Sequence, residues 1–147
     1  MSGESGLYKR LRDGLNSPDT RIERVENGLV DGMPDVNYCF AGHEGWIELK
    51  APDMPKRPAT PLLQSQHQLS VAQANWFLRQ SLAGGTGFLL IGTTVGVVIV
   101  KGLTVGRLGT TINKLPLNGL ERISAWSSTW NRSGLWEELR AILCDGI

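Results

Sequence analysis

The chain has 147 residues, of which 41% are hydrophobic and 20% are charged, and its formal net charge is +1. This length and composition fit one globular domain, so we expect residues 1–147 to form a single domain. The near-neutral charge does not by itself indicate a nucleic-acid-binding protein, although a local basic face balanced by acidic residues elsewhere gives the same sum.

Zinc, disulfide-rich and membrane classes are disfavoured. The two cysteines and two histidines are too few, and wrongly spaced, for a disulfide framework or a four-ligand zinc site. The first residues hold no apolar signal core, and the most apolar stretch, residues 88–100, is too short to span a bilayer. We therefore expect a cytoplasmic protein without a membrane partner.

The N-terminal third predicts one helix followed by strands. Leu7, Leu11 and Leu15 recur at helical spacing and predict a helix over residues 4–15. A turn at 16–19 and a weakly alternating strand at 21–26 follow. Residues 35–41 and 46–50 then predict two strands joined by a compact turn at 42–45, which together form a hairpin.

The middle of the chain predicts a long loop, a helix and two buried strands. Residues 51–69 hold four prolines and three glutamines without a period, and a loop of this length is usually functional or mobile. Residues 70–83 predict a helix, which Gly84-Gly85 ends. Residues 88–91 and 95–100 are apolar runs typical of strands buried on both faces. The apolar stripe of the helix is Val71, Ala74, Phe77, Leu78 and Leu82.

The C-terminal third is less regular. Residues 103–133 show no clear pattern, and residues 135–143 predict a closing helix. The predicted order is therefore α-β-β-β-α-β-β-α, which is a mixed α/β domain with a central sheet.

Two short acidic motifs stand out, Gly32-Met33-Pro34-Asp35 and Glu48-Leu49-Lys50. Alternation along the strand 46–50 places Ile47 and Leu49 on one face and Trp46, Glu48 and Lys50 on the other. A turn centred between positions 43 and 44 would bring Asp35 opposite position 52, one pleat beyond Lys50. Two carboxylates and an ammonium would then meet at one edge of the sheet.

Such a set suits the chemistry of a hard cation. Asp35 and Glu48 offer oxygen ligands, and the backbone carbonyl of Leu49 could add a third, which fits Mg²⁺ or Mn²⁺. An ion of this kind polarises a phosphodiester and lowers the pKa of bound water. Lys50 could orient or deprotonate the attacking water, or stabilise the charge of the phosphorane.

These motifs resemble the PD-(D/E)XK nuclease superfamily, and within it the small phage-type and VRR-NUC-like nucleases. Those proteins carry a Gly-x-Pro-Asp loop, a hairpin ending in Glu-x-Lys, and a glutamine-containing helix that leads to a strand. The matching features are residues 32–35, residues 46–50, and Gln73 followed by residues 88–91. The similarity covers about residues 4–101, and residues 102–147 form a C-terminal extension without a match. The Val-Arg-Arg signature of one subgroup is absent.

The resemblance implies a restriction-endonuclease-like αβββαβ core with a mixed central sheet flanked by helices. It implies that Asp35 and Glu48 are metal ligands and that Lys50 is the catalytic lysine of a Mg²⁺-dependent DNA endonuclease, in a bacterial or phage-infected cell. One alternative is a Holliday-junction or branched-DNA resolvase, which would need a dimer. A second is an inactive nucleic-acid-binding module of the same fold, against which the intact Asp35, Glu48 and Lys50 argue.

Three supporting residues have two readings each. Related nucleases often carry a glutamate on the first helix that reaches the metal water, but Glu4 can also favour the helix N-terminal dipole. Glu26 is either a further acidic group near the metal or a solvated carboxylate. Gln73 either forms a capping box with Ser70 or points toward the catalytic lysine. We expect only one of these two roles for Gln73, because one side chain cannot easily serve both.

Basic and aromatic residues supply the predicted partners. Most scattered basic residues are simply solvated, but Lys56 and Arg57 lie in the loop directly after the catalytic strand, which makes them the candidates for contact with DNA phosphates. Trp46 is expected to pack under the helix 70–83, and the other tryptophans to build a C-terminal core or a subunit contact. Because aromatic residues are enriched at interfaces, we expect a homodimer. The tryptophans in question are Trp46, Trp126, Trp130 and Trp136.

Overall fold

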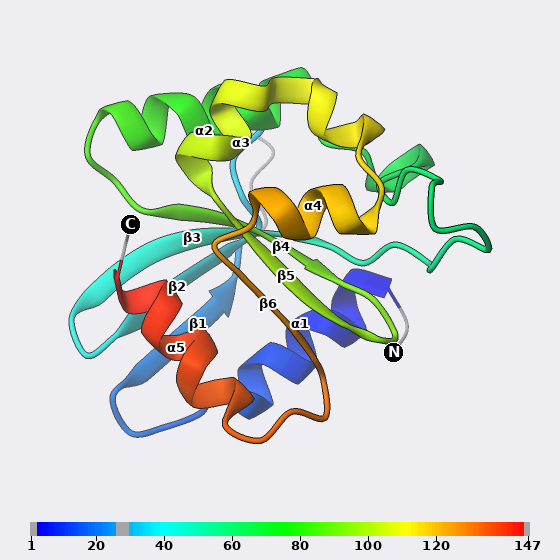
Figure 1. The fold of residues 1–147 in the computed structure, drawn as a ribbon. Helices are drawn as coiled ribbons and strands as arrows, with labels where there is room; N and C mark the ends of the chain where they lie inside the picture. Colours follow the sequence, from blue (N-terminus) through cyan, green and yellow to red (C-terminus); the bar gives the residue numbers. More distant parts are fainter. Residues whose placement is uncertain (1–2, 26–29, 146–147) are drawn as a thin grey trace.

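The computed structural model describes residues 3–25 and 30–145, and these form one α/β unit with a central sheet (Figure 1). The strands are β1 (Thr20–Arg24), β2 (Val36–Phe40), β3 (His43–Lys50), β4 (Gly87–Gly92), β5 (Gly96–Lys101) and β6 (Trp126–Thr129). The helices are α1 (Gly3–Gly14), α2 (Val71–Leu82), α3 (Gly102–Leu108), α4 (Leu117–Ile123) and α5 (Leu135–Asp145), with short 3₁₀ helices η1 (Ser65–His67) and η2 (Gly109–Lys114).

The described strands form a single sheet in the order β1-β2-β3-β4-β5-β6. Neighbouring strands pair antiparallel, apart from the parallel pair β3 and β4, which α2 connects. The predicted fold class, a mixed central sheet flanked by helices with the element order αβββαβ at its start, is confirmed.

Helices cover both faces of the sheet, with α1 and α5 below it and α2, α3 and α4 above it in Figure 1. Two apolar clusters fill these layers, one containing Leu7 of α1 and Leu139 of α5, the other containing Phe77 of α2 and Leu120 of α4. Strand β4 is buried along its whole length and contributes alternate side chains to both clusters. This confirms the prediction of strands buried on both faces.

The β2–β3 hairpin has a tighter turn than predicted, so the predicted register is wrong by four residues. Phe40 pairs with His43 and Val36 pairs with Ile47, around a two-residue turn at Ala41-Gly42. Both turn residues have positive φ, the backbone geometry that matches the twist of a two-residue hairpin. Because the error is an even number of residues, the predicted face of each side chain is unchanged. Continuing this register places Asp35 next to Glu48.

Helix α2 has the predicted position, but its predicted apolar stripe is wrong at both ends. Ala74 and Phe77 are buried, whereas Val71 and Leu82 are 64% and 73% exposed. Only the middle turns of α2 therefore lie over buried neighbours, and the first and last turns project beyond them.

The segment 51–69 is irregular but attached. Leu62, Leu63 and Leu69 are buried in the cluster above the sheet. The Leu62 N–H donates a hydrogen bond of 3.1 Å to the Leu115 carbonyl oxygen, beside an isolated β-bridge that joins Pro61 and Pro116. The loop is thus held against the segment 103–133, whose helices α3 and α4 and edge strand β6 the sequence left unassigned, whereas the predicted closing helix 135–143 is confirmed as α5.

Three C-terminal tryptophans pack within the chain on the cluster below the sheet. The rings of Trp130 and Trp136 lie 6.1 Å apart, and the Arg10 guanidinium lies 4.1 Å from the Trp130 ring centroid. Trp46 meets Trp76 of α2 edge-on at 6.0 Å, as predicted. The C-terminal-core reading of the tryptophans therefore accounts for them, and the homodimer stays a prediction without their support. Among the described residues, no helix is long and apolar enough to cross a membrane.

Candidate active site

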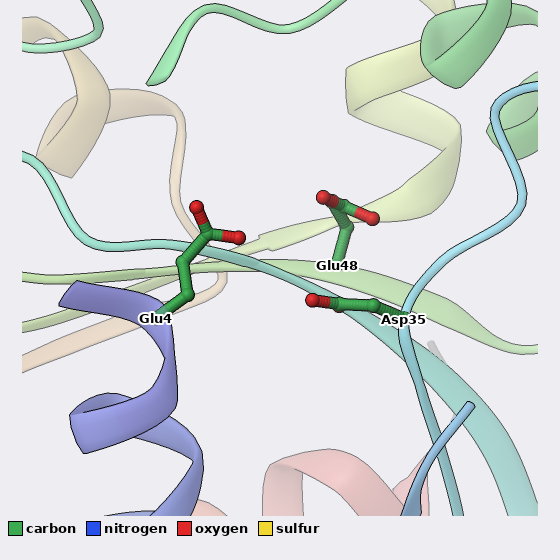
Figure 2. Close-up of side chains that lie close together, drawn as sticks. All are labelled: Glu4, Asp35 and Glu48. Carbon is green, nitrogen blue, oxygen red and sulfur yellow. The ribbon is translucent and has the colours of Figure 1, made fainter. Parts of the chain in front are cut away.

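Three carboxylates converge where β2 begins and β3 ends. Glu4 lies in the first turn of α1, Asp35 directly before β2, and Glu48 near the end of β3. One oxygen atom of each lies within 4.8 Å of the others, and Figure 2 shows the three side chains turned toward one another. The structure therefore brings the predicted pair together and adds Glu4, as the active-site reading of Glu4 requires.

The three residues reach this point from different layers. The apolar side chains of α1, Leu7 and Leu11, fix that helix below the sheet and leave its first turn at the end of β3. Glu48 points to the opposite face, because Ile47 and Leu49 on either side of it are buried in the cluster below.

The packing of the loop before Asp35 requires glycine at position 32 of the Gly-x-Pro-Asp motif. Gly32 has a φ of 80°, and a Cβ atom at this position would overlap the carbonyl oxygen of Ala72 at the start of α2. The loop before Asp35 therefore packs directly on the backbone of α2, an approach that only glycine permits. This contact, together with the buried Pro34, sets the position of Asp35.

Asp35 is oriented by the backbone of β3. The Leu49 N–H donates a hydrogen bond of 3.2 Å to Asp35 Oδ1. The N–H and C=O of one strand residue point to the same side, so the Leu49 carbonyl is directed toward the side of Asp35. The Leu49 carbonyl is therefore suitably directed for the third oxygen ligand that the sequence suggested.

Burial and mutual repulsion disfavour the charged forms of these carboxyls. Burial, reinforced by the nearby charge of Asp35, raises the pKa of Glu48 to about 8, although Lys50 opposes the shift. Burial also raises the pKa of Asp35, helped by Glu4 and opposed by the Leu49 N–H and by Arg24. A divalent cation with oxygen ligands would relieve this repulsion, so the donor set fits Mg²⁺ or Mn²⁺.

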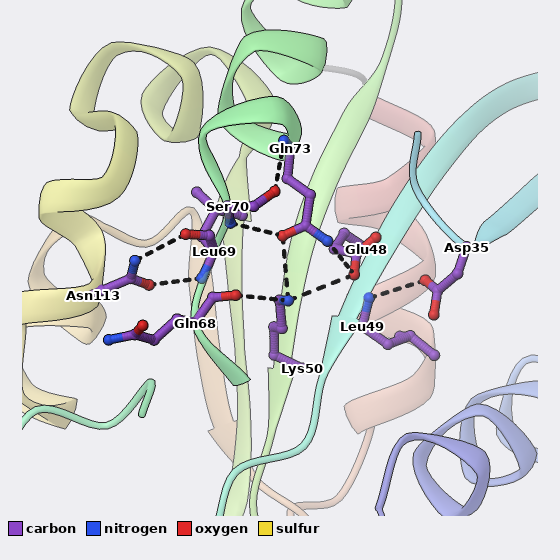
Figure 3. Close-up of polar contacts among 9 residues, drawn as sticks. All are labelled: Asp35, Glu48, Leu49, Lys50, Gln68, Leu69, Ser70, Gln73 and Asn113. Atoms are coloured by element: carbon purple, nitrogen blue, oxygen red, sulfur yellow. Dashed lines mark hydrogen bonds and ion pairs between the residues drawn. The ribbon is translucent and has the colours of Figure 1, made fainter. Parts of the chain in front are cut away.

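Lys50 lies beside this cluster and is only 5% exposed. Its Nζ donates to the Gln68 carbonyl oxygen at 3.1 Å and to Gln73 Oε1 at 3.3 Å, and lies 3.8 Å from Glu48 Oε2 (Figure 3). An ammonium has three N–H donors. Two carbonyl oxygens therefore accept two of these N–H groups, and the Glu48 carboxyl lies at ion-pair distance, so the lysine is held in one position.

Gln73 performs both roles that the sequence suggested, so the expectation that it would serve only one is wrong. It forms a capping box with Ser70, with hydrogen bonds of 3.1 Å and 3.0 Å. The same Oε1 accepts from Lys50, and Nε2 donates to Glu48 Oε2 at 3.2 Å. A carboxamide can do this because its oxygen accepts two hydrogen bonds and its nitrogen donates two.

The remaining predicted residues lie elsewhere. Lys56 and Arg57 are exposed in the loop that follows β3, and their contact with DNA stays a prediction. Glu26 lies outside the described residues. Among the described residues, the site therefore consists of the three carboxylates together with Lys50 and Gln73.

Sequence reasoning missed three contributors. Arg24 ends β1 beside Asp35 and donates to Ser5 Oγ at 3.0 Å, which the antiparallel order of β1 and β2 could have indicated. Gln68 contributes a backbone carbonyl, for which a sequence carries no signal. Asn113, which bonds to Leu69 in Figure 3, lies in the segment without a pattern.

No protein-family model matches the chain, and no curated protein matches it. Among solved structures, the chain is similar to Hjc, a Holliday junction resolvase of the archaeal hyperthermophile Archaeoglobus fulgidus. The TM-score is 0.45 with 16% sequence identity, and the match covers 69% of this chain and 77% of that chain.

Proposed function

We propose that this protein is a metal-dependent DNA endonuclease that hydrolyses phosphodiester bonds. The observation that carries the proposal is the convergence of Glu4, Asp35 and Glu48 beside the buried ammonium of Lys50. Clustered carboxylates gather a divalent cation, and a fixed cationic side chain next to them suits a reaction in which a phosphate gains negative charge.

The metal ligands in this proposal are Glu4, Asp35, Glu48 and the Leu49 carbonyl. When bound there, Mg²⁺ or Mn²⁺ would supply Lewis-acid polarisation of the phosphodiester and a lower pKa for the attacking water. The chain orients its own ligands, because the Leu49 N–H fixes Asp35 Oδ1 and Gln73 Nε2 fixes Glu48 Oε2. Each of these carboxylates keeps a second oxygen for the ion.

Lys50 acts in this proposal as a fixed positive charge. Two of its N–H groups already donate to Gln68 and Gln73, and the ammonium lies 3.8 Å from Glu48 Oε2, so the lysine is held as a donor. Stabilising the charge of the phosphorane needs only such a preorganised cation, whereas removing a proton from water needs a free amine. Of the roles that the sequence left open, the structure thus favours charge stabilisation.

DNA would approach over the loop that follows β3. Lys56 and Arg57 are exposed there, a few residues beyond Lys50, and can contact phosphates without changing the site. Contacts of this type add affinity independently of sequence, so the proposal includes DNA as the partner without a sequence preference.

The proposal is tested by cleavage of linear, flapped and four-way DNA with Mg²⁺, using wild type and Asp35→Ala. We expect wild type to cut at least one form and Asp35→Ala to cut none. Symmetrical cuts in four-way DNA, with a dimer mass by light scattering, would identify a resolvase. A protein of 16.1 kDa that stays monomeric would exclude the simplest form of that function. Binding of all three DNAs without cleavage in Mg²⁺ or Mn²⁺ would contradict the proposal and favour the inactive binding module.

A further inference from the structure

The backbone of residues 68–70, which contacts Lys50 and Gln73, is held by the side chain of Asn113 in η2, within the C-terminal segment 102–145. Asn113 Oδ1 accepts a hydrogen bond of 2.7 Å from the Leu69 N–H, and Asn113 Nδ2 donates one of 2.9 Å to the Leu69 carbonyl (Figure 3). Asn113 thus satisfies both backbone groups of Leu69, as a residue of a neighbouring strand would do.

In the chain, Leu69 lies between Gln68 and Ser70, and each of these two residues sets the position of one acceptor of Lys50. On one side is Gln68, whose carbonyl oxygen accepts directly. On the other is Ser70, whose N–H and hydroxyl hold Gln73 in the capping box, with Gln73 Oε1 turned to Lys50. A shift of the Leu69 backbone would therefore move both acceptors at once.

The segment that contains Asn113 also contacts the same loop at a second point. At its other end, Leu62 donates to the Leu115 carbonyl beside the bridge of Pro61 and Pro116. Ile112 and Leu69 are both buried in the cluster above the sheet. The short segment 112–116 therefore holds the loop 61–69 at both ends, and Asn113 provides the attachment nearest to the lysine.

We propose that Asn113 is a positioning residue for Lys50, through which the C-terminal segment completes the active site. It touches neither the carboxylates nor Lys50 in the described contacts, and it acts through Leu69. The catalytic part of this inference rests on the proposed function, because it takes Lys50 to act in DNA cleavage. The structural part, that Asn113 fixes the Lys50 ammonium, stands independently of the reaction.

The first test compares cleavage by Asn113→Ala, the near-isosteric Asn113→Asp, and the control Asn118→Ala, an exposed asparagine on α4. We expect kcat to fall about 10- to 100-fold in both Asn113 variants, with KM for DNA within about twofold, because a displaced group mainly weakens the transition state. Asn113→Asp keeps the volume but loses the N–H donor to Leu69, so wild-type activity in that variant would overturn the proposal. Asn118→Ala should cleave like wild type.

The second test needs no activity. A buried, hydrogen-bonded ammonium exchanges its protons slowly, so proton–nitrogen NMR of metal-free wild type should show a Lys50 Nζ signal that Lys50→Ala lacks. We expect this signal to shift or broaden in both Asn113 variants and to stay unchanged in Asn118→Ala. An unchanged signal in a folded Asn113 variant would overturn the proposal. Failure of both Asn113 variants to fold would also overturn it, because Asn113 would then support the whole fold.

The two tests separate the inference from the proposed function. If wild type cleaves no DNA, the proposed function fails, and the Lys50 signal still decides whether Asn113 holds the ammonium. If wild type cleaves DNA and the Asn113 variants do so equally well, the inference fails and the endonuclease proposal stands.

Discussion

Two groups of polar side chains meet at Glu48 and are built in opposite ways. The carboxylate cluster, Glu4, Asp35 and Glu48, brings like charges within 4.8 Å of one another. In the lysine network, formed by Lys50, Gln68, Ser70 and Gln73, the ammonium donates hydrogen bonds to two carbonyl oxygens and lies at ion-pair distance from Glu48. A bound cation would therefore stabilise the carboxylate cluster, whereas the lysine network already holds its own cation and would contribute a positive charge in a fixed position.

Removing a carboxylate should have the largest effect. We expect Asp35→Ala to lower the cleavage rate by on the order of 100-fold or more, because the variant loses a ligand of the proposed ion. Chelation of wild type should abolish cleavage, and Mg²⁺ or Mn²⁺ should restore it. Glu23→Ala, which removes an exposed carboxylate of β1, is the matched control and should retain activity. Full activity of wild type in excess chelator would refute metal dependence.

Replacing the lysine should break the second group alone. We expect Lys50→Ala to lower cleavage on the order of 100-fold while metal binding and DNA binding stay close to wild type, since phosphate affinity is spread over many cations. Lys50→Arg should also fail, because a planar guanidinium cannot place its donors as the compact ammonium does. Lys9→Ala, at an exposed site on α1, is the control. A rate of cleavage in Lys50→Ala equal to wild type would remove the lysine from the mechanism.

The pH dependence of the free energy of unfolding should report the burial and mutual repulsion of the clustered carboxylates. Burial raises the pKa of Glu48 from 4.5 to about 8, so between these values the folded state holds a proton that the unfolded state has lost. The free energy of unfolding of metal-free protein should therefore fall as pH rises through this window, by at most about 1.4 kcal/mol per pH unit, and level off above it.

Urea unfolding in chelator measures this dependence. Glu48→Gln should remove most of the slope of unfolding free energy against pH, because its side chain stays neutral. Added Mg²⁺ should raise the unfolding free energy of the wild-type protein at the upper end of the pH window. A wild-type stability that is flat or rises across the window would show that Glu48 is not held in its neutral form.

The smallest expected effect separates the two roles of Gln73. Ser70→Ala and Gln73→Ala should each lower the free energy of unfolding by about 1 kcal/mol, because both break the capping box. Ser70→Ala keeps the backbone N–H that holds Gln73 Oε1, whereas Gln73→Ala also removes the contacts with Lys50 and Glu48, so Gln73→Ala alone should lower cleavage, by about tenfold. Equal activity of the two variants, at equal stability, would reduce Gln73 to a helix cap.

The parts of the site that the sequence predicted are those set by local periodicity. Alternation in β3 placed Glu48 and Lys50 on one face, and helical spacing put Glu4 on the same stripe of α1 as Leu7 and Leu11. The register of Asp35 was missed because Ala41, which gives no turn signal, takes a positive φ beside Gly42. The predicted face of each side chain is nevertheless correct, because side chains alternate with a period of two and the register error is an even number of residues.

The parts that could not be predicted depend on contacts between distant segments. Asn113 and Leu69 are 44 positions apart, and Asn113 lies in a segment with no apolar period. Gln68 contributes a backbone carbonyl, which is common to all residue types. For Gln73 the sequence showed both roles, and only the geometry of its carboxamide shows that they are compatible.

The most direct test of the carboxylate cluster is a calorimetric titration of Mg²⁺ and Mn²⁺ into metal-free protein, without DNA, at a pH above the Glu48 pKa of about 8. We predict that wild type and Lys50→Ala bind the ion with similar affinity, and that Asp35→Ala and Glu48→Ala lose this binding. Equal binding by wild type and Asp35→Ala, or no binding by wild type, would contradict the assignment of these carboxylates as a metal site.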